Sequence, residues 1–189
     1  MVTATPQSPF DASQSTKDAL KDGADAGGEA GKSQKEQPKR KLMFRVFTGS
    51  NLNASTDGIP VSLVMRVYRL RGLNDFQGKT FQGFLEDTKG GAATSNEVVS
   101  ESQMMLLPGR SYISLEEIPW DARYLGVVAL FRGPAEHRWR FIYDVEKSVD
   151  SGITIGAHAC ALTSTAGDLA VAPPTAADTL STITCPAPK

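Results

Sequence analysis

The sequence predicts an all-β domain built as a two-sheet β-sandwich, with one short helical segment inserted between two of its strands. Two observations carry this expectation. Short segments of alternating apolar and polar residues recur through the middle of the chain, separated by turn residues such as Gly, Pro, Asn and Asp. They do not alternate with long amphipathic helices, as the strands of a parallel βαβ sheet would. We therefore expect two packed layers of strands.

About seven strands are expected on this basis. The clearest is Val61–Leu70, where Val61, Leu63, Met65 and Val67 share one face and polar residues alternate with them, which is the pattern of a half-buried strand. The segment Tyr124–Phe131 is apolar on both faces and is therefore expected at the centre of a sheet. The predicted strands are Leu42–Thr48, Val61–Leu70, Glu97–Leu107, Arg110–Leu115, Tyr124–Phe131, Arg138–Val145 and Ile153–Leu162.

A single helix is expected over Phe76–Asp87. Asn74 and Asp75 are suitable N-capping residues before it, and Gly90 with Gly91 would end it. Four large side chains approximate one apolar face, and we expect this face to dock on a sheet. These side chains are Phe76, Phe81, Phe84 and Leu85.

The 189 residues suit one domain with appendages better than two domains. Residues 1–40 contain few large apolar side chains and are expected to form a polar N-terminal tether. Residues 41–163 hold the predicted β-sandwich with its helical insertion near 74–89. Residues 164–189 are rich in Ala, Pro and Thr and are expected to form a C-terminal tail.

Composition argues against several partners. The chain has 20 Lys and Arg against 21 Asp and Glu, so its net charge of -1 provides no general attraction to nucleic acid. No run of about 18 apolar residues is present, so no helix is expected to cross a bilayer. The first residues lack the basic and apolar regions of a secretory signal, which fits a cytosolic protein or a mature or trimmed chain.

The sequence offers little for catalysis or for a metal. His137 and His158 are the two histidines, and His158 with Cys160 would supply two metal ligands where a zinc site needs at least three. The segment Ala26–Ser33 ends in Gly-Lys-Ser, but it lacks the preceding strand and following helix that a phosphate-binding loop requires. We expect no metal, no cofactor and no enzymatic activity.

With these sites set aside, a polar loop before the Val61–Leu70 strand is the best functional candidate. A rigid scaffold that presents an ordered loop is a common design of binding modules. Asp57-Gly58 can supply the positive φ of a tight turn there. The candidate partner-binding residues are Asn51, Leu52, Asn53, Ala54, Ser55, Thr56, Asp57, Gly58 and Ile59.

The two cysteines, Cys160 and Cys185, both lie near the C-terminus. In an oxidising compartment they could close a loop of about 25 residues and stabilise the fold by roughly 3–4 kcal/mol. In the cytosol they would be free thiols.

Several ordered blocks resemble a known family. The segment PVSLVMRVYRLRGLNDFQGKTFQGFLED, which is Pro60–Asp87, is similar to the strand-plus-helix block of type VI secretion lipoproteins of the TssJ (SciN, VasD) kind. Leu107–Gly109 agrees with the same family, as does Ala122–Ala129 followed by Phe-Arg and, further on, Trp-Arg. The resemblance covers roughly Lys41–Leu162, and several blocks in compatible order are more specific than one motif.

The resemblance implies a transthyretin-like two-sheet sandwich on an outer-membrane lipoprotein that faces the periplasm. It also implies that the loop between the first two strands, here Asn51–Ile59, binds the periplasmic C-terminal domain of TssM. In that contact we expect Leu52 and Ile59 to be the apolar anchors. The family's lipid-bearing cysteine is not in this sequence, because Cys160 and Cys185 are far from the N-terminus. We expect an N-terminal lipid anchor in the full-length protein, with residues 1–40 as its spacer.

A second reading is a carrier of a small molecule or lipid, also of the transthyretin class. Its ligand would occupy a cleft between the sheet and the predicted helix, near Phe76 and Phe81. A deep apolar pocket at that place would favour the carrier over the adaptor.

Overall fold

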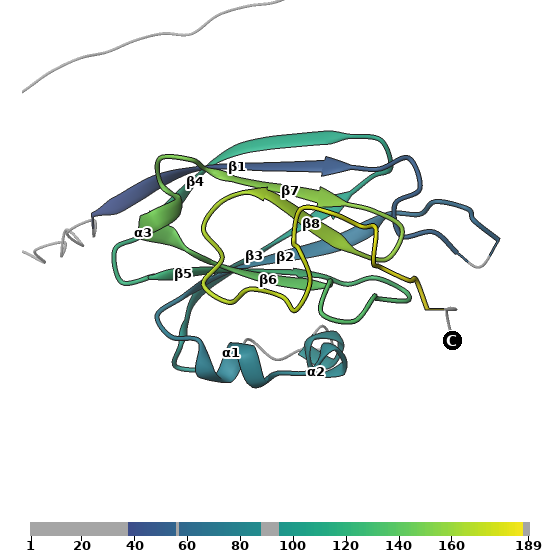
Figure 1. The fold of residues 1–189 in the computed structure, drawn as a ribbon. Helices are drawn as coiled ribbons and strands as arrows, with labels where there is room; N and C mark the ends of the chain where they lie inside the picture. The colour runs from purple at the N-terminus through teal and green to yellow at the C-terminus, as the bar shows by residue number, and fades with distance from the viewer. Residues whose placement is uncertain (1–37, 56, 88–94, 187–189) are drawn as a thin grey trace, which may run out of the picture. The chain divides into compact units, whose positions relative to one another are not determined.

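Two four-stranded sheets face each other in the computed structural model, which describes residues 38–55, 57–87 and 95–186 (Figure 1). Sheet A has the strand order β4-β1-β7-β8, and sheet B has the order β3-β2-β5-β6. The strands of sheet A are β4 (Ser111–Pro119), β1 (Lys39–Thr48), β7 (Ile153–Ala157) and β8 (Leu162–Ala166). Those of sheet B are β3 (Val98–Leu106), β2 (Leu63–Leu70), β5 (Tyr124–Ala129) and β6 (Arg140–Asp144). The predicted all-β, two-sheet sandwich with a short helical insertion is confirmed.

Strand pairing is antiparallel except between β1 and β7, which run parallel. The inward-facing residues of both sheets alternate along each strand, as the pleat requires. Together they form the main hydrophobic core. Its members include Leu42, Phe44 and Val46 of β1, Leu63, Met65 and Val67 of β2, Leu125 and Val127 of β5, Phe141 and Tyr143 of β6, and Ile153 and Ile155 of β7.

Strand β2 is buried on both faces. The expectation of a half-buried strand is therefore wrong for its outer face. Its outward-facing Tyr68 and Leu70 belong to a second apolar cluster with Phe76 and Phe84. Figure 1 shows the reason, because the helical insertion covers this outer face of sheet B. The rings of Tyr68 and Phe76 lie 5.1 Å apart edge to face, a favourable arrangement for aromatic pairs.

The insertion consists of two short helices, α1 (Asn74–Gly78) and α2 (Phe81–Glu86), where one helix was expected. The helix is interrupted between them, because Lys79 is extended and the Thr80 hydroxyl accepts a hydrogen bond from the Gly83 N–H to start α2. The start of α1 is capped from a distance, since the Glu97 carboxylate accepts the N–H groups of Asn74 and Asp75.

Arg140 fixes the helices to sheet B. Its guanidinium donates hydrogen bonds to the carbonyls of Phe76, Gln77 and Lys79, at 2.6, 2.9 and 3.0 Å. These carbonyls lie at the end of α1, where a helix provides no N–H partners for its own carbonyl groups. The arginine on the outer face of β6 therefore has a structural role.

The last predicted strand, Ile153–Leu162, is in fact two strands. β7 ends at Ala157, a turn follows, and β8 begins at Leu162. Residues 167–186, called the strap below, then run back over the edges of both sheets. The Ala170 N–H donates to the Ile142 carbonyl of β6, and the Ser164 N–H of β8 donates to the Ala177 carbonyl.

Arg138 holds the strap from within. Its side chain is completely buried, whereas the alternation of arginines with Trp139 and Phe141 in the predicted strand Arg138–Val145 is typical of arginines that face solvent. The guanidinium donates to the carbonyls of Leu162, Ala176 and Ala177 and to the Thr175 hydroxyl. Since a buried guanidinium needs such acceptors, the strap and Arg138 stabilise each other. The predicted boundaries at residues 40 and 163 stay a prediction.

Candidate partner-binding loop

The candidate loop connects β1 to β2 and is fastened at its base to other connections of the sandwich. The Gly49 N–H donates to the Ala157 carbonyl at the end of β7, at 2.8 Å. The Gly49 carbonyl accepts from the Gly109 N–H in the β3–β4 turn, at 3.2 Å. Where the loop returns, the Val61 N–H donates to the Leu52 carbonyl at 3.1 Å. The base of the loop is therefore part of the rigid scaffold.

Leu52 and Asn53 belong to this base and do not face solvent. Leu52 is completely buried in the main core, so its expected role as an apolar anchor for a partner is wrong. Asn53 is also buried and has a φ of 49°, a left-handed conformation that asparagine tolerates better than most residues. Its amide joins three segments, because it donates to the Ser62 carbonyl and accepts from the Arg132 N–H.

The tip of the loop is a compact turn closed by its own backbone. The Ser55 N–H donates to the Ile59 carbonyl at 2.9 Å, and the Gly58 N–H donates to the Ser55 carbonyl at 2.9 Å. The Ser55 hydroxyl accepts from the Ile59 N–H at 3.2 Å. Gly58 has a φ of 73°, as Asp57-Gly58 led us to expect.

The exposed part of the candidate set is smaller than the sequence suggested. Asn51, Asp57, Gly58 and Ile59 are exposed, and Ala54 and Ser55 are half-buried. Ile59 has 59% of its surface accessible, so this side chain presents apolar surface to solvent at the tip. Thr56 lies outside the described residues.

The β3–β4 turn adds a second exposed apolar side chain near the loop. Leu107 is 47% exposed, and its carbonyl accepts a 2.7 Å hydrogen bond from the Thr48 hydroxyl at the end of β1. Sequence reasoning placed Leu107 at the end of a strand and did not single it out. Its proximity to the loop comes from pairing between distant segments, although the Pro108-Gly109 turn marked that end of the strand.

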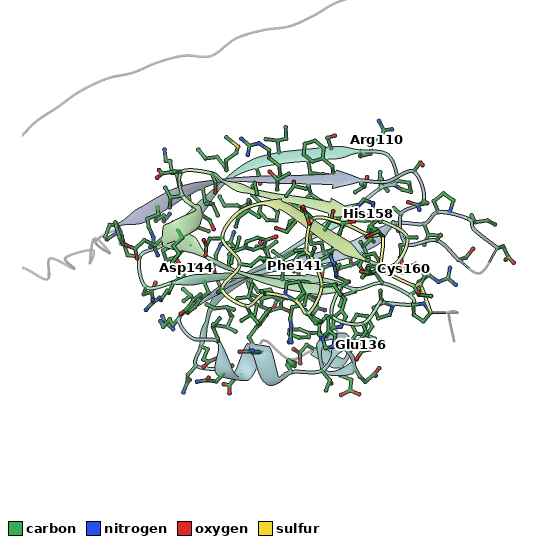
Figure 2. All side chains as sticks on the ribbon, viewed as in Figure 1. Arg110, Glu136, Phe141, Asp144, His158 and Cys160 are labelled. Carbon is green, nitrogen blue, oxygen red and sulfur yellow. A yellow bond between two sulfur atoms is a disulfide. The ribbon has the colours of Figure 1, made fainter. Side chains whose placement is uncertain are left out.

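His158 and Cys160 lie on the β7–β8 turn, at the end of the sandwich that carries the loop (Figure 2). A disulfide joins Cys160 to Cys185, so its sulfur is not a thiolate ligand for a metal. The His158 Nε2 lies 3.0 Å from the Thr163 hydroxyl, and burial lowers the pKa of this imidazole. Among the described residues, no group of three His, Cys, Asp or Glu side chains converges as a metal site would require.

A cavity of about 530 Å³ lies beside the helices, near the place expected for a carrier's ligand. Its lining combines the rings of Tyr68, Phe76 and Phe84 with polar side chains, among them Asp75 and Lys79. The three rings are almost completely buried against one another, so they offer little apolar surface to a ligand. Phe81 packs on Trp139 and does not line the cavity.

Comparison with known families gives a match over most of this domain. Residues 40–160 match the T6SS-SciN model, described as type VI secretion lipoprotein, VasD, EvfM, TssJ. The chain belongs to this family of type VI secretion lipoproteins. The resemblance stated from the sequence blocks is thus confirmed. A comparison with curated proteins gives no match.

Solved structures show the same fold at low identity. The chain is similar to TssJ1, a type VI secretion lipoprotein of Pseudomonas aeruginosa, at 22% identity and a TM-score of 0.58, covering 72% of this chain and 100% of that one. Serratia marcescens Lip, a membrane-bound component of the type VI secretion system, matches at 20% identity and a TM-score of 0.53, covering 66% of this chain and 96% of Lip. A structure named as the TssM C-terminal domain (869-1107) from EAEC matches at 23% identity and a TM-score of 0.59, covering 68% of this chain and 98% of the matched chain.

Family membership also gives the location. The family consists of lipoproteins anchored in the outer membrane that face the periplasm, which agrees with the location that the resemblance implied. None of the helices in the described part of the chain has the length and apolar character needed to span a bilayer.

Proposed function

We propose that this protein is a non-enzymatic adaptor of the type VI secretion membrane complex, and that it binds the periplasmic C-terminal domain of TssM through the β1–β2 loop. The observation that carries the proposal is the contrast between the buried base of the loop and its exposed tip. Leu52 and Asn53 anchor its base in the scaffold, while Asp57, Gly58 and Ile59 are exposed at its tip. The hydrogen bonds of Ser55 with Gly58 and Ile59 restrict the backbone there, which lowers the conformational entropy lost on association.

The contact surface that we propose combines the tip with the neighbouring turn. Ile59 and Leu107 would be the apolar anchors, since both are exposed and both lie on connections tied to the end of β1. The exposed carboxylate of Asp57 would add a polar contact at the rim. Leu107 replaces Leu52 as the second anchor in this proposal.

The structural comparisons support TssM as the partner. One similar structure bears the name of the TssM C-terminal domain, and another is named type VI membrane complex, at 22% identity and a TM-score of 0.59. In the first structure, 68% of this 189-residue chain is enough to cover 98% of the matched chain. The matched chain is therefore shorter than a domain that spans residues 869-1107. A complex of TssM with a protein of the present fold would contain such a shorter chain beside the TssM domain.

Replacing the loop tip tests the proposal. Residues Ser55–Ile59 would be exchanged for a Gly-Ser segment of equal length, which leaves Leu52 and Asn53 in place to preserve the fold. We expect an unchanged circular dichroism spectrum and loss of binding to the purified TssM periplasmic domain in calorimetry. Binding at the parental affinity would show that the tip does not carry the recognition.

The carrier function stays as a second candidate, because a cavity does lie between the helices and the sheet. Native mass spectrometry of the purified protein tests it directly. A co-purified small molecule that is lost when Phe76 is replaced by Ala would support the carrier, and an unliganded mass throughout would favour the adaptor alone.

A further inference from the structure

The two sides of the sandwich differ in how their edge strands are covered. On one side, the strap provides hydrogen-bond partners to the edge strands β6 and β8 of the two sheets. On the other side, β3 and β4 are the edge strands. Within the described ranges, β4 has a ladder with β1 alone, so its outer edge has no strand beside it. An uncovered edge is a template for pairing with another strand.

Strand β4 also carries exposed apolar side chains along the outer face of sheet A. Ile113 is 64% exposed and Leu115 is 53% exposed. On the neighbouring strand, Met43 lies opposite Leu115 and Arg45 lies opposite Ile113, and Phe47 follows on the same face. The outer face of sheet B is covered by α1 and α2, whereas Figure 1 shows no helix over this face of sheet A among the described elements.

We propose that β4 pairs antiparallel with β4 of a second copy, so that the two A sheets join into one continuous sheet around a two-fold axis at Ser114. In that register Ile113 lies opposite Leu115 of the second copy, and the reverse pair forms on the other side of the axis. Four exposed apolar side chains then become neighbours on one face, where cross-strand apolar pairs stabilise a sheet.

Charge is compatible with this register and disfavours one that is displaced toward the end of β4. With the axis at Ser114, Glu116 lies opposite Tyr112 and Glu117 lies opposite Ser111, so no like charges face each other. Moving the axis to Glu116 would place the two Glu116 carboxylates face to face, which is unfavourable. Each carboxylate already has a basic partner within its own chain, Arg69 for Glu116 and Lys39 for Glu117.

The seam between two edge strands is small, so the association is expected to be weak in solution. Anchoring in the outer membrane, which the family provides, confines the copies to a surface and raises their effective concentration. A contact that is weak in solution is therefore sufficient to pair two copies at the membrane. This inference does not depend on TssM binding, because it rests on Ile113 and Leu115 of β4, which are not among the residues proposed to contact TssM.

Sedimentation equilibrium of the full chain tests the pairing. We expect the average mass to rise above 20.2 kDa toward twice that value as the concentration increases. Leu115→Lys would place ammonium groups beside Ile113 and is expected to weaken association by about tenfold or more. Met105→Lys is the matched control, because Met105 is 62% exposed on β3 of the other sheet and should leave association unchanged.

Cysteine cross-linking tests the register. No cysteine within the described residues is free, so an introduced thiol is the reactive one. A mixture of the Ile113→Cys and Leu115→Cys variants should form disulfide-linked dimers faster than either variant alone, because these two positions face each other across the axis. Equal rates in all three samples would overturn the register, and a parent protein that stays monomeric at every concentration would overturn the pairing.

The same variants separate this inference from the proposed adaptor function. Leu115→Lys should bind the TssM domain with the affinity of the parent protein. A parent protein that is monomeric, together with loss of TssM binding by Leu115→Lys, would assign β4 to that partner and overturn the pairing of two copies.

Discussion

The side-chain oxygen of Asn53 accepts a 2.9 Å hydrogen bond from the backbone N–H of Arg132, which ties the β1–β2 loop to the β5–β6 connection. The same amide donates to the Ser62 carbonyl at 2.8 Å. One buried side chain thus adds to the backbone hydrogen bonds that fasten the base of the loop.

Asn53→Ala should destabilise the fold and loosen the loop. It leaves the Ser62 carbonyl and the Arg132 N–H without the Asn53 amide and places a less suitable residue at positive φ, so we expect a loss of about 2–4 kcal/mol. Urea unfolding measures this change. Asn51→Ala, at an exposed position, is the matched control and should change stability by less than about 0.5 kcal/mol. Equal effects of the two substitutions would contradict the role given to Asn53.

Arg138→Ala should release the strap. The substitution removes the donors to Leu162, Ala177 and Thr175 and opens a cavity, so we expect a loss of about 2–4 kcal/mol and faster proteolytic cleavage after residue 166. Mass spectrometry of a limited digest identifies the cleavage site. Arg110→Ala changes an exposed arginine and should leave the digest as in the parent protein.

Stability should fall at acidic pH through His158. Burial lowers the pKa of its imidazole in the folded protein below the ordinary value of 6.5, so the unfolded chain takes up the proton first. The contribution of neutral His158 to the free energy of unfolding is complete above pH 6.5 and is lost as the pH falls below that value. Urea midpoints at pH 7.5 and pH 5 should therefore differ less in His158→Gln than in the parent protein. His137→Gln, which removes the exposed histidine, is the matched control for the substitution itself.

The disulfide should contribute strongly to stability. Cys160 and Cys185 are 25 residues apart, and a loop of that size corresponds to about 3–4 kcal/mol in the chain-entropy model. Replacing both by Ser should lower the free energy of unfolding by about that amount. Thiol titration of the denatured, unreduced parent protein should find no free thiol, and two free thiols would remove this role.

The strand pattern was predictable because alternation and turn residues are local signals. They located β1, β2 and β5 and the turn at Asp57-Gly58. They could not show that Leu52, inside a polar loop, enters the core, because that burial depends on packing against distant strands. For the same reason, the exposure of Leu107 at the adjoining turn was not visible in the sequence.

Other departures also come from tertiary contacts. The outer face of β2 is buried because α1 and α2 cover it, and Arg138 is buried because the strap closes over it. The predicted single helix is interrupted at Lys79 and Thr80, where the threonine acts as a new N-cap. Each case involves residues far apart in the chain, or a choice between capping and continuing a helix, which apolar periodicity does not specify.

The most direct test of recognition by the loop is calorimetric titration of the TssM periplasmic domain into two variants with an equally drastic change at exposed isoleucines. Ile59→Asp alters the loop tip, and Ile113→Asp alters the outer face of β4. We predict that Ile59→Asp weakens binding by about tenfold or more, since it places a charge at the centre of the proposed contact, while Ile113→Asp keeps the parental affinity. Parental affinity in Ile59→Asp would contradict recognition by the loop.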